Sequence, residues 1–280
     1  MNQTENFVES TGKAAALRSI GVGQLLFALA FIVEGAFALG TRDFLLGQEP
    51  IPPGLPWRET LACLSGALML LTGLGLLVSP LSRLSALVLT AYFLLWLLVL
   101  QLPRAFLQPQ NEGYWLGVGE VSTLVAGGWL IWLALGDTAD RSIRIARVWF
   151  GIALVPIGLS HLVYFTGSHL VYFGGASRLI PHYMPFRTFL TYFTGFAHIA
   201  AGLAIAAGFV PRLAATLEAI MESLFTLIVW GTAIVIAPAS RMNWVSFFAS
   251  TALSAAAWAL ARSYRKAPGA SQRTAAANRR

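Results

Sequence analysis

The chain has 280 residues, of which 57% are hydrophobic and 11% charged, and its mean hydropathy is +0.69. Soluble domains carry roughly a quarter of their residues as charged side chains, so this composition excludes a soluble globular protein and favours a polytopic membrane protein. The net charge of +7 does not indicate a nucleic-acid-binding protein, because the basic residues flank hydrophobic segments and form no patch interleaved with aromatic residues.

Eight hydrophobic segments are long enough to cross a bilayer as helices, which takes about 20 residues for roughly 30 Å of hydrocarbon. Their Leu-, Ala- and Gly-rich composition lacks the alternation of a transmembrane β-barrel. The sequence therefore predicts an all-α membrane protein with eight transmembrane helices, at about residues 17–39, 57–79, 83–103, 114–135, 145–165, 187–209, 211–236 and 243–262.

One stretch of the chain occurs twice. Residues 51–83 return without a gap as residues 180–212, an offset of 129 positions. An even number of spans in each copy makes the two copies parallel, related by an axis along the membrane normal. The sequence thus predicts two parallel four-helix repeats, 17–136 and 147–262, with anchors that include Pro52 and Pro181, Pro56 and Pro185, Gly66 and Gly195, Gly73 and Gly202, and Trp115 and Trp244.

Lysine and arginine at the span ends predict the orientation. If the N-terminus is cytoplasmic, most of them fall on that side, which also receives the tail 1–16, the linker 137–146 and the basic tail 263–280. We expect the last of these to be disordered and held near anionic headgroups. The long loops, about 40–56, 104–113 and 166–185, fall outside and contain aromatic residues and prolines, so we expect rigid turns or short re-entrant segments there.

Four ionisable residues lie inside spans of the second half. They are His161 on the fifth span, His198 on the sixth, and Glu218 and Glu222 on the seventh. A charge in hydrocarbon costs about 2.5 kcal/mol or more, so each needs a partner or a water-lined cavity. The two glutamates are four positions apart on one helix face, which Thr226 continues, and two carboxylates this close predict a shared or bound proton. Glu222, a full turn deeper, is the better candidate.

Other interpretations of these residues stay open. A single intramembrane histidine commonly serves as a hydrogen-bonded packing contact between helices. A haem held by His161 and His198 would be supported by a second histidine pair, which the spans lack. The single cysteine, Cys63, excludes an intrachain disulfide and a cysteine metal site, and the sequence predicts no metal site.

The duplication separates residues that both copies share, which we interpret as structural, from residues that only one copy has. His161, His198, Glu218 and Glu222 have apolar counterparts in the first half, which has two unmatched acids of its own, Glu34 and Glu120. We therefore predict a proton or polar network from the unduplicated residues. The duplicated Arg58 and Arg187 follow a Pro-x-x-x-Pro turn, where they can snorkel to the outer interface or bind an anionic group.

Several runs in both halves resemble a known family of membrane proteins. They are RVWFG at 147–151, GLSH at 158–161, the two prolines of 180–185, YFTG at 192–195, AAGL at 200–203 and Trp258. In these the chain resembles DoxX/DoxD-like membrane proteins, here in duplicated form. The resemblance implies membership in membrane redox systems, since DoxD-type subunits are associated with thiosulfate:quinone oxidoreduction and DoxX-type proteins with membrane-bound redox or thiol-stress complexes. It supplies no catalytic residues, and one cysteine argues against sulfur transfer by this chain itself.

These observations lead to a functional hypothesis and two alternatives. The hypothesis is a DoxX-like subunit of the bacterial inner membrane that supports quinone-linked redox chemistry with a soluble or membrane redox partner, and in which His161, Tyr164, His198 and Glu222 line a quinone or proton site. A proton-coupled transporter of a small molecule or lipid is one alternative, since parallel repeats with midplane acids also build carriers. A non-catalytic scaffold that anchors a soluble partner is the other. No signal for an oligomeric state was found.

Overall fold

The structure is a computed structural model that describes residues 21–45, 47–136, 140–166, 169–172, 180 and 184–264. For residues 164–166 and 169–172 it describes the backbone only. Three predicted segments lie wholly or partly outside the described residues. They are the tail 1–16, almost all of the basic tail 263–280, and part of the linker 137–146.

Eight helical segments of the described chain are long and apolar enough to cross a membrane, which is the architecture of a multi-pass membrane protein. Each overlaps one of the predicted spans, so the prediction of eight spans is confirmed. Six are single helices: α2 (Val22–Thr41), α3 (Arg58–Leu77), α6 (Glu112–Ala134), α7 (Asp140–Leu162), α8 (Arg187–Ala207) and α11 (Arg241–Ser263).

The other two spans contain a π-helical segment. Helix α4 (Ser79–Trp96) continues through η1 (Leu97–Gln101) into α5 (Leu102–Leu107), and α9 (Pro211–Phe225) continues through η3 (Thr226–Gly231) into α10 (Thr232–Ile236). A π-helical turn widens the helix by one residue and is frequent at functional sites. Both segments begin within two turns of buried polar side chains, described below.

Large apolar side chains cover the outside of the bundle. Leu64, Leu71, Phe193 and Leu227, for example, are all more than half exposed, whereas Gly and Ala fill many of the contacts between helices. This distribution suits hydrocarbon, because lipid does not penalise exposed Leu and Phe, and helices in lipid associate through small residues that allow close packing.

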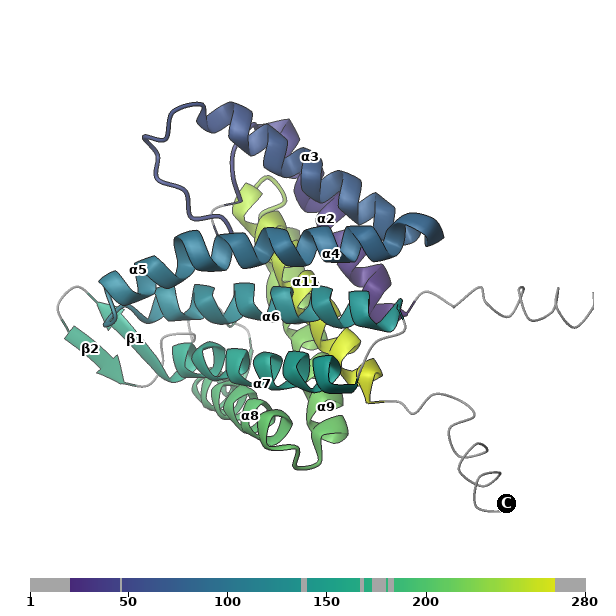
Figure 1. Ribbon diagram of the computed structural model, residues 1–280. Coiled ribbons are helices and arrows are strands. Elements are labelled where there is room, and N and C mark those ends of the chain that lie inside the picture. Colours follow the sequence, from purple (N-terminus) through teal and green to yellow (C-terminus); the bar gives the residue numbers. More distant parts are fainter. Residues whose placement is uncertain are drawn as a thin grey trace, which may run out of the picture.

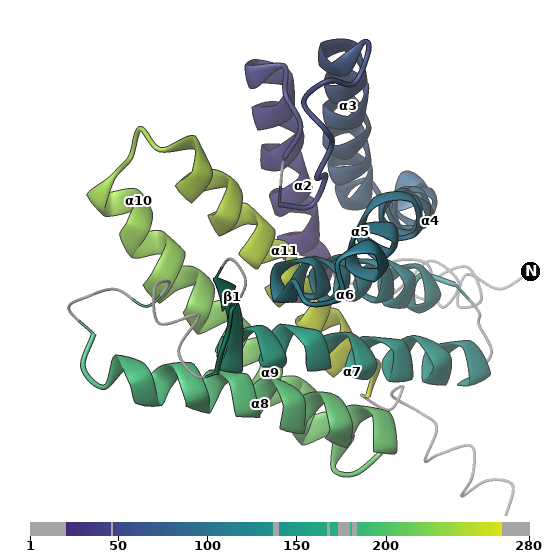
Figure 2. The same ribbon diagram turned by 90° about the vertical axis from the view of Figure 1, so that its left-hand side faces the viewer.

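Helices α6 and α11 form the centre of the molecule. Helix α6 packs against α4, α7 and α11, and α11 packs against α2, α6 and α9. Of the apolar part of α6, 72% is buried, against 22% for the α9–α10 segment. The first helix of each half therefore contacts the last helix of the other half, α2 on α11 and α7 on α6, while the α2–α3 and α7–α8 pairs diverge from each other (Figure 2).

Glycines make the closest helix crossings. A Cβ atom on Gly35 of α2 would lie 2.5 Å from the carbonyl oxygen of Gly66 on α3, and one on Gly158 of α7 would lie 2.5 Å from that of Gly195 on α8. These distances leave no room for a side chain. These glycines therefore set the backbone spacing in both helix pairs.

The described chain begins and ends at the same side of the bundle (Figure 1). Gly21, just before α2, lies against the guanidinium of Arg262 near the end of α11, and Arg147 of α7 donates hydrogen bonds to Ser263. Helix α5 and the strands β1 (Val163–Thr166) and β2 (His169–Tyr172) lie at the other side.

The loop between α2 and α3 folds back into the bundle. Phe44, Leu45, Gln48 and Glu49 are each at most 4% exposed, and Phe44 packs with Ile51 against α3. This agrees with the prediction of a rigid or re-entrant segment in the loop 40–56. The chain buries these residues because their apolar and polar groups both find partners on α2, α3 and α4.

Asp43 fixes this loop to two arginines. Its carboxylate lies 2.7 Å from Arg58 of α3 and 3.5 Å from Arg241 of α11. Burial raises the pKa of Asp43, but hydrogen bonds from Arg58 and the Phe44 N–H, together with the charges of Arg58 and Arg241, outweigh it, so the pKa is lowered. Because Arg241 belongs to the second half, this ionic contact joins the two halves of the chain.

The predicted fifth span is too long at its end. We predicted a helix to residue 165, but α7 ends at Leu162 and β1 follows at once, pairing antiparallel with β2. The run Val-Tyr-Phe-Thr at 163–166 is rich in β-branched and aromatic residues, which favour strands. This hairpin therefore replaces the last turn of the predicted helix.

Candidate functional site

Four ionisable side chains meet between α7, α8 and α9. We call His161, His198, Glu218 and Glu222 the His/Glu centre. The glycine crossing brings the histidines together, because a Cβ on Gly195 would lie 2.9 Å from Cβ of His161 and one on Gly158 would lie 3.0 Å from Cβ of His198. The structure thus brings together all four residues that the sequence predicted, from three different spans.

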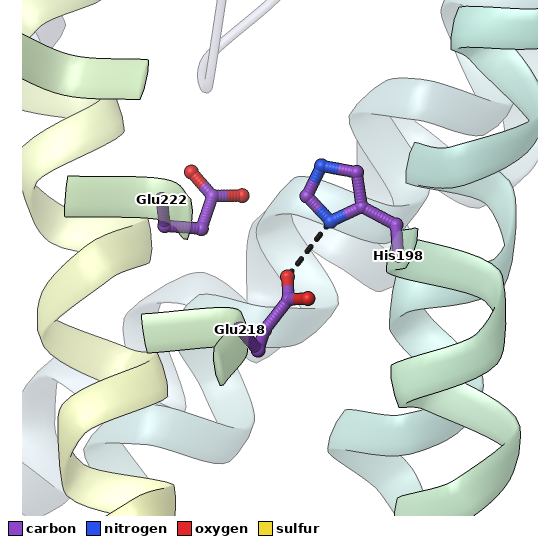
Figure 3. A group of neighbouring side chains, drawn as sticks. All are labelled: His198, Glu218 and Glu222. Carbon is purple, nitrogen blue, oxygen red and sulfur yellow. Dashed lines mark hydrogen bonds and ion pairs between the residues drawn. The ribbon is translucent and has the colours of Figure 1, made fainter. Parts of the chain in front are cut away.

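His198 and Glu218 form the best-defined contact of the centre. Nδ1 of His198 lies 2.7 Å from Oε1 of Glu218, and both side chains are at most 4% exposed. Glu222 lies one turn further along α9, and its carboxylate also turns toward the imidazole (Figure 3). One ligand atom from each of these three residues lies within 4.8 Å of the others.

His161 completes the centre from α7. Its Nδ1 lies 2.9 Å from the carbonyl oxygen of Ile157, so Nδ1 carries the proton and donates it to that oxygen. Its Nε2 is buried and has no hydrogen-bond partner in the described part of the chain. The ring centroids of His161 and His198 are 5.2 Å apart, and those of His161 and Phe225 are 6.1 Å apart.

Charge in the centre is incompletely balanced. Glu218 and Glu222 are 1% and 6% exposed, and Oε2 of Glu218 is buried with no hydrogen-bond partner among the residues that the structure describes. Among the described residues, His198 is the only basic group that forms an ion pair with either of them. Two carboxylates in a low-dielectric site need compensating positive charge or protons, because isolated buried charges are costly.

Hydroxyl groups pair α9 with α11 beside the centre. Thr226 contacts Ser250 at 2.7 Å and also donates to the backbone carbonyl of Glu222 at 2.9 Å. One turn earlier Ser223 contacts Ser254 at 2.7 Å and accepts from the Trp258 indole. The predicted stripe from Glu218 through Thr226 therefore ends in satisfied interhelical hydrogen bonds that hold α9 in place.

A second buried polar cluster, which we call the loop centre, lies in the first half. It contains two carboxylates, Glu34 of α2 and Glu49 of the loop between α2 and α3. These two residues are 1% and 0% exposed. Gln48 donates to Glu34 at 3.0 Å, while Ser65 and Tyr92 both donate to Oε1 of Glu49. Gln101, in η1, also donates to the Gln48 carbonyl oxygen at 3.2 Å.

Burial dominates the electrostatics of Glu49. It raises the pKa of this loop carboxyl, and hydrogen bonds from Ser65, Tyr92 and the Leu45 N–H oppose that rise. In the same cluster Oε2 of Glu34 and Oε1 of Gln48 are buried and have no hydrogen-bond partner within the described ranges. The loop centre is thus largely, but not fully, satisfied.

Sequence reasoning found only Glu34 of this cluster. It missed Gln48, Glu49, Ser65, Tyr92 and Gln101, because a loop position carries no periodicity that would mark it as buried. One signal was available. The apolar residues Phe44, Leu45 and Ile51 flank the Gln-Glu pair on both sides, as in a segment that folds inward.

The remaining predicted site residues lie apart from the His/Glu centre. Glu120 of α6 is partly buried and within electrostatic range of Glu222. The guanidinium of Arg58 donates hydrogen bonds to the Asp43 carboxylate and to the carbonyl oxygens of Ile51 and Pro52. Arg187 donates to the Ile180 carbonyl at 3.0 Å. The side chain of Tyr164, which was predicted to line the quinone site, lies outside the described residues.

A large apolar groove lies on the other side of α7. It has a volume of about 910 Å³ and runs between α6, α7 and α8. Among its lining residues are Trp115, Ser122, Trp149, Pro156, Ser160 and Ala206. None of the four residues of the His/Glu centre lines it, so the predicted quinone-site residues surround a small polar centre and not this groove.

Fold and site together define a multi-pass helical membrane protein with a buried centre of two histidines and two glutamates. Comparisons with protein-family models, with curated proteins and with solved structures find no match for this chain. Its function is therefore argued from the geometry of the centre and the groove.

Proposed function

We propose that this chain is a DoxX-like subunit of the bacterial inner membrane, built from two parallel four-helix repeats, that binds a quinone and supports its redox chemistry together with a partner protein. In this proposal both termini are cytoplasmic, as the distribution of Lys and Arg at the span ends favours. The groove between α6, α7 and α8 takes the quinone, and the His/Glu centre exchanges protons.

Local geometry at equivalent positions supports the repeat part of the proposal. At an offset of 129 positions the two halves share a left-handed residue before a helix, an arginine bond to a loop carbonyl, an indole bond to a proline carbonyl and the start of a π-helical segment. The pairs are Trp57 and Phe186, Arg58 and Arg187, Trp115 and Trp244, and Leu97 and Thr226.

Size and lining of the groove support a quinone as the ligand. A volume of about 910 Å³ suits a drug-sized molecule, and apolar walls with a few polar groups are usual for such sites. Trp115 and Trp149 offer aromatic surface for the ring, and the hydroxyls of Ser122 and Ser160 can donate to quinone oxygens. The apolar remainder suits an isoprenoid tail.

One observation carries the link between groove and centre. Ser160, which lines the groove, and His161, which belongs to the centre, both hydrogen-bond to the carbonyl oxygen of Ile157, at 2.6 and 2.9 Å. A ligand in the groove that takes the Ser160 hydroxyl as a donor leaves this oxygen to His161 alone and so strengthens the Nδ1–H bond that orients the imidazole. Quinone reduction takes up protons, and a histidine held next to the site is suited to supply them.

Quinone binding to the purified chain in nanodiscs tests the proposal, with quenching of Trp115 and Trp149 fluorescence by a short-chain quinone as the readout. Ala206→Phe fills the groove from α8 and is expected to lower the affinity by at least tenfold. Leu71→Phe, on the outer face of α3, is the matched control and should bind like the wild type. Equal binding by all three proteins would remove the groove as the quinone site.

A further inference from the structure

We propose that the His/Glu centre is a binding site for one divalent first-row transition-metal ion. The ligands are Nε2 of His161, Nε2 of His198 and the carboxylate of Glu222, and Glu218 orients His198 through Nδ1. This inference goes beyond the proposed quinone function, in which the His/Glu centre only exchanges protons, and it does not depend on what occupies the groove.

His161 has the arrangement of a metal-binding histidine. Ligating histidines almost always donate their second ring N–H to a carbonyl or carboxylate, which fixes the tautomer and points the free nitrogen at the ion. Nδ1 of His161 donates to the Ile157 carbonyl, and Nε2 is left buried with no partner among the described residues. A histidine that served only for packing would use this nitrogen in a contact with a neighbouring helix.

His198 shows the same arrangement with a carboxylate in place of the carbonyl. Glu218 holds Nδ1 at 2.7 Å, and Nε2 faces away from Glu218 (Figure 3). Two imidazoles that bind one tetrahedral ion through nitrogens at about 2.0–2.1 Å place their ring centres roughly 5 Å apart. The rings of His161 and His198 are 5.2 Å apart, which matches this spacing. His161 lies outside the 4.8 Å group of His198, Glu218 and Glu222, so its ring turns toward the ion when the ion binds.

Glu222 supplies the third ligand and, with Glu218, the charge balance. Its ligand atom lies within 4.8 Å of those of His198 and Glu218. Among the described residues, His198 is the only basic group that pairs with either carboxylate, and it pairs with Glu218. An ion of charge +2 balances the negative charge that this single pair leaves in the centre. The buried environment strengthens this interaction, since water does not screen it.

The donor set selects the class of metal. Two imidazoles and one carboxylate suit Mn²⁺, Fe²⁺, Co²⁺ and Zn²⁺, whereas Mg²⁺ and Ca²⁺ prefer oxygen donors alone and Cu⁺ prefers sulfur. Three protein ligands also leave a coordination position open for a further group. The sequence prediction of no metal site considered cysteine ligands and a haem, and it did not weigh a site assembled from three spans.

The test uses the full chain, purified in detergent and treated with a chelator, with Co²⁺ as the probe. We expect one Co²⁺ per chain by elemental analysis, intense visible d–d absorption typical of four- or five-coordinate ligation, and displacement by Zn²⁺. His161→Gln and Glu222→Gln each remove a ligand and should weaken binding by at least about 100-fold. Glu218→Gln should weaken it by about 10–100-fold with a retained spectrum, as for outer-shell partners.

Glu34→Gln is the matched control, a buried glutamate of the loop centre, and should bind Co²⁺ like the wild type. Elution volume and melting temperature show that each variant is folded. X-ray absorption of wild type loaded with Zn²⁺ needs no variant and should show two imidazole ligands. Absence of stoichiometric binding, oxygen-only coordination, or unchanged affinity in both ligand variants would overturn the proposal, whatever the outcome for quinone binding.

Discussion

Buried polar atoms in this bundle divide into those with partners and those without. The hydroxyl groups of Thr72, Thr90 and Thr194 donate hydrogen bonds to backbone carbonyls of their own helices. His161 Nε2 and Glu218 Oε2 instead remain unpaired within the described chain. A buried polar atom without a partner costs about 1–3 kcal/mol, which a purely structural residue has no reason to retain. At the scale of single residues, these atoms are what distinguishes the His/Glu centre from packing.

Asp43 allows a prediction at the same scale, for the ionic contact that joins the halves. Its folded pKa is lowered, so its stabilising contribution is present above the unfolded pKa and is lost as the pH falls through the folded value. Asp43→Asn should therefore destabilise the protein at neutral pH by about 1 kcal/mol, since the contact is partly exposed. The difference from wild type should begin to shrink below about pH 4, near the ordinary aspartate pKa, and should vanish as the pH falls through the lower folded pKa. Thermal unfolding in detergent across this pH range measures both.

Glu59→Gln provides the comparison for Asp43→Asn. Glu59 pairs with Arg42 at 2.9 Å, but both side chains are more than 60% exposed, so the pair contributes little at any pH. A difference between Asp43→Asn and wild type that stayed constant down to pH 3 would contradict the assigned role of the Asp43 carboxylate.

Helices α7 and α8 show how an element places the reactive side chains. Gly158 and Gly195 allow backbone contact, and the histidines follow three positions later on the same faces. The α2–α3 pair has the same glycine crossing at Gly35 and Gly66 without the histidines. The crossing is therefore a shared scaffold, and the histidines of the second half are an addition to it.

Gly158→Ala tests this crossing. The added Cβ would lie 2.5 Å from the Gly195 carbonyl oxygen, so α7 and α8 must separate, and we expect a loss of about 1–3 kcal/mol of stability from overpacking. Thermal unfolding of purified protein measures it. Gly40→Ala, near the end of α2, is the control, because its Cβ would meet nothing within 4 Å. Equal melting temperatures for the two variants would show that the crossing has room to spare.

Periodicity and composition predicted the elements well, since a span of apolar residues in lipid has few alternatives to a helix. The members of the His/Glu centre could also be predicted, because charged residues inside apolar runs are conspicuous. Glu49 could not, because a loop residue becomes buried only through contacts with Ser65 and Tyr92 that are distant in sequence. Likewise, the distance between His161 and His198 depends on a helix crossing that sequence spacing alone does not specify.

At the scale of the whole molecule, the two halves are interlocked. Because α2 packs on α11 and α7 on α6, each first helix packs mainly against the last helix of the other half (Figure 1). Helix α7 also contacts its own last helix, α11, where Arg147 donates to Ser263. Arg241 adds a polar contact between the halves by binding Asp43 and the carbonyl of Phe44. A half on its own would expose the buried small-residue surfaces of its central helix, which in the whole chain the other half covers.

Division of the chain within 137–139 tests this interlocking. Co-expressed as separate polypeptides, residues 1–138 and 139–280 should assemble and co-purify, because the contacts between α6 and α7, α2 and α11, and α6 and α11 do not need the covalent connection. Each half expressed alone should be degraded or self-associate through its uncovered central helix. The measurement is affinity co-purification from membranes, with size-exclusion chromatography of each half. A single half that remained monomeric and as thermally stable as the pair would mean that each half folds on its own, with α2 against α6 and α7 against α11. The exchanged packing of the whole chain would then not be required for stability.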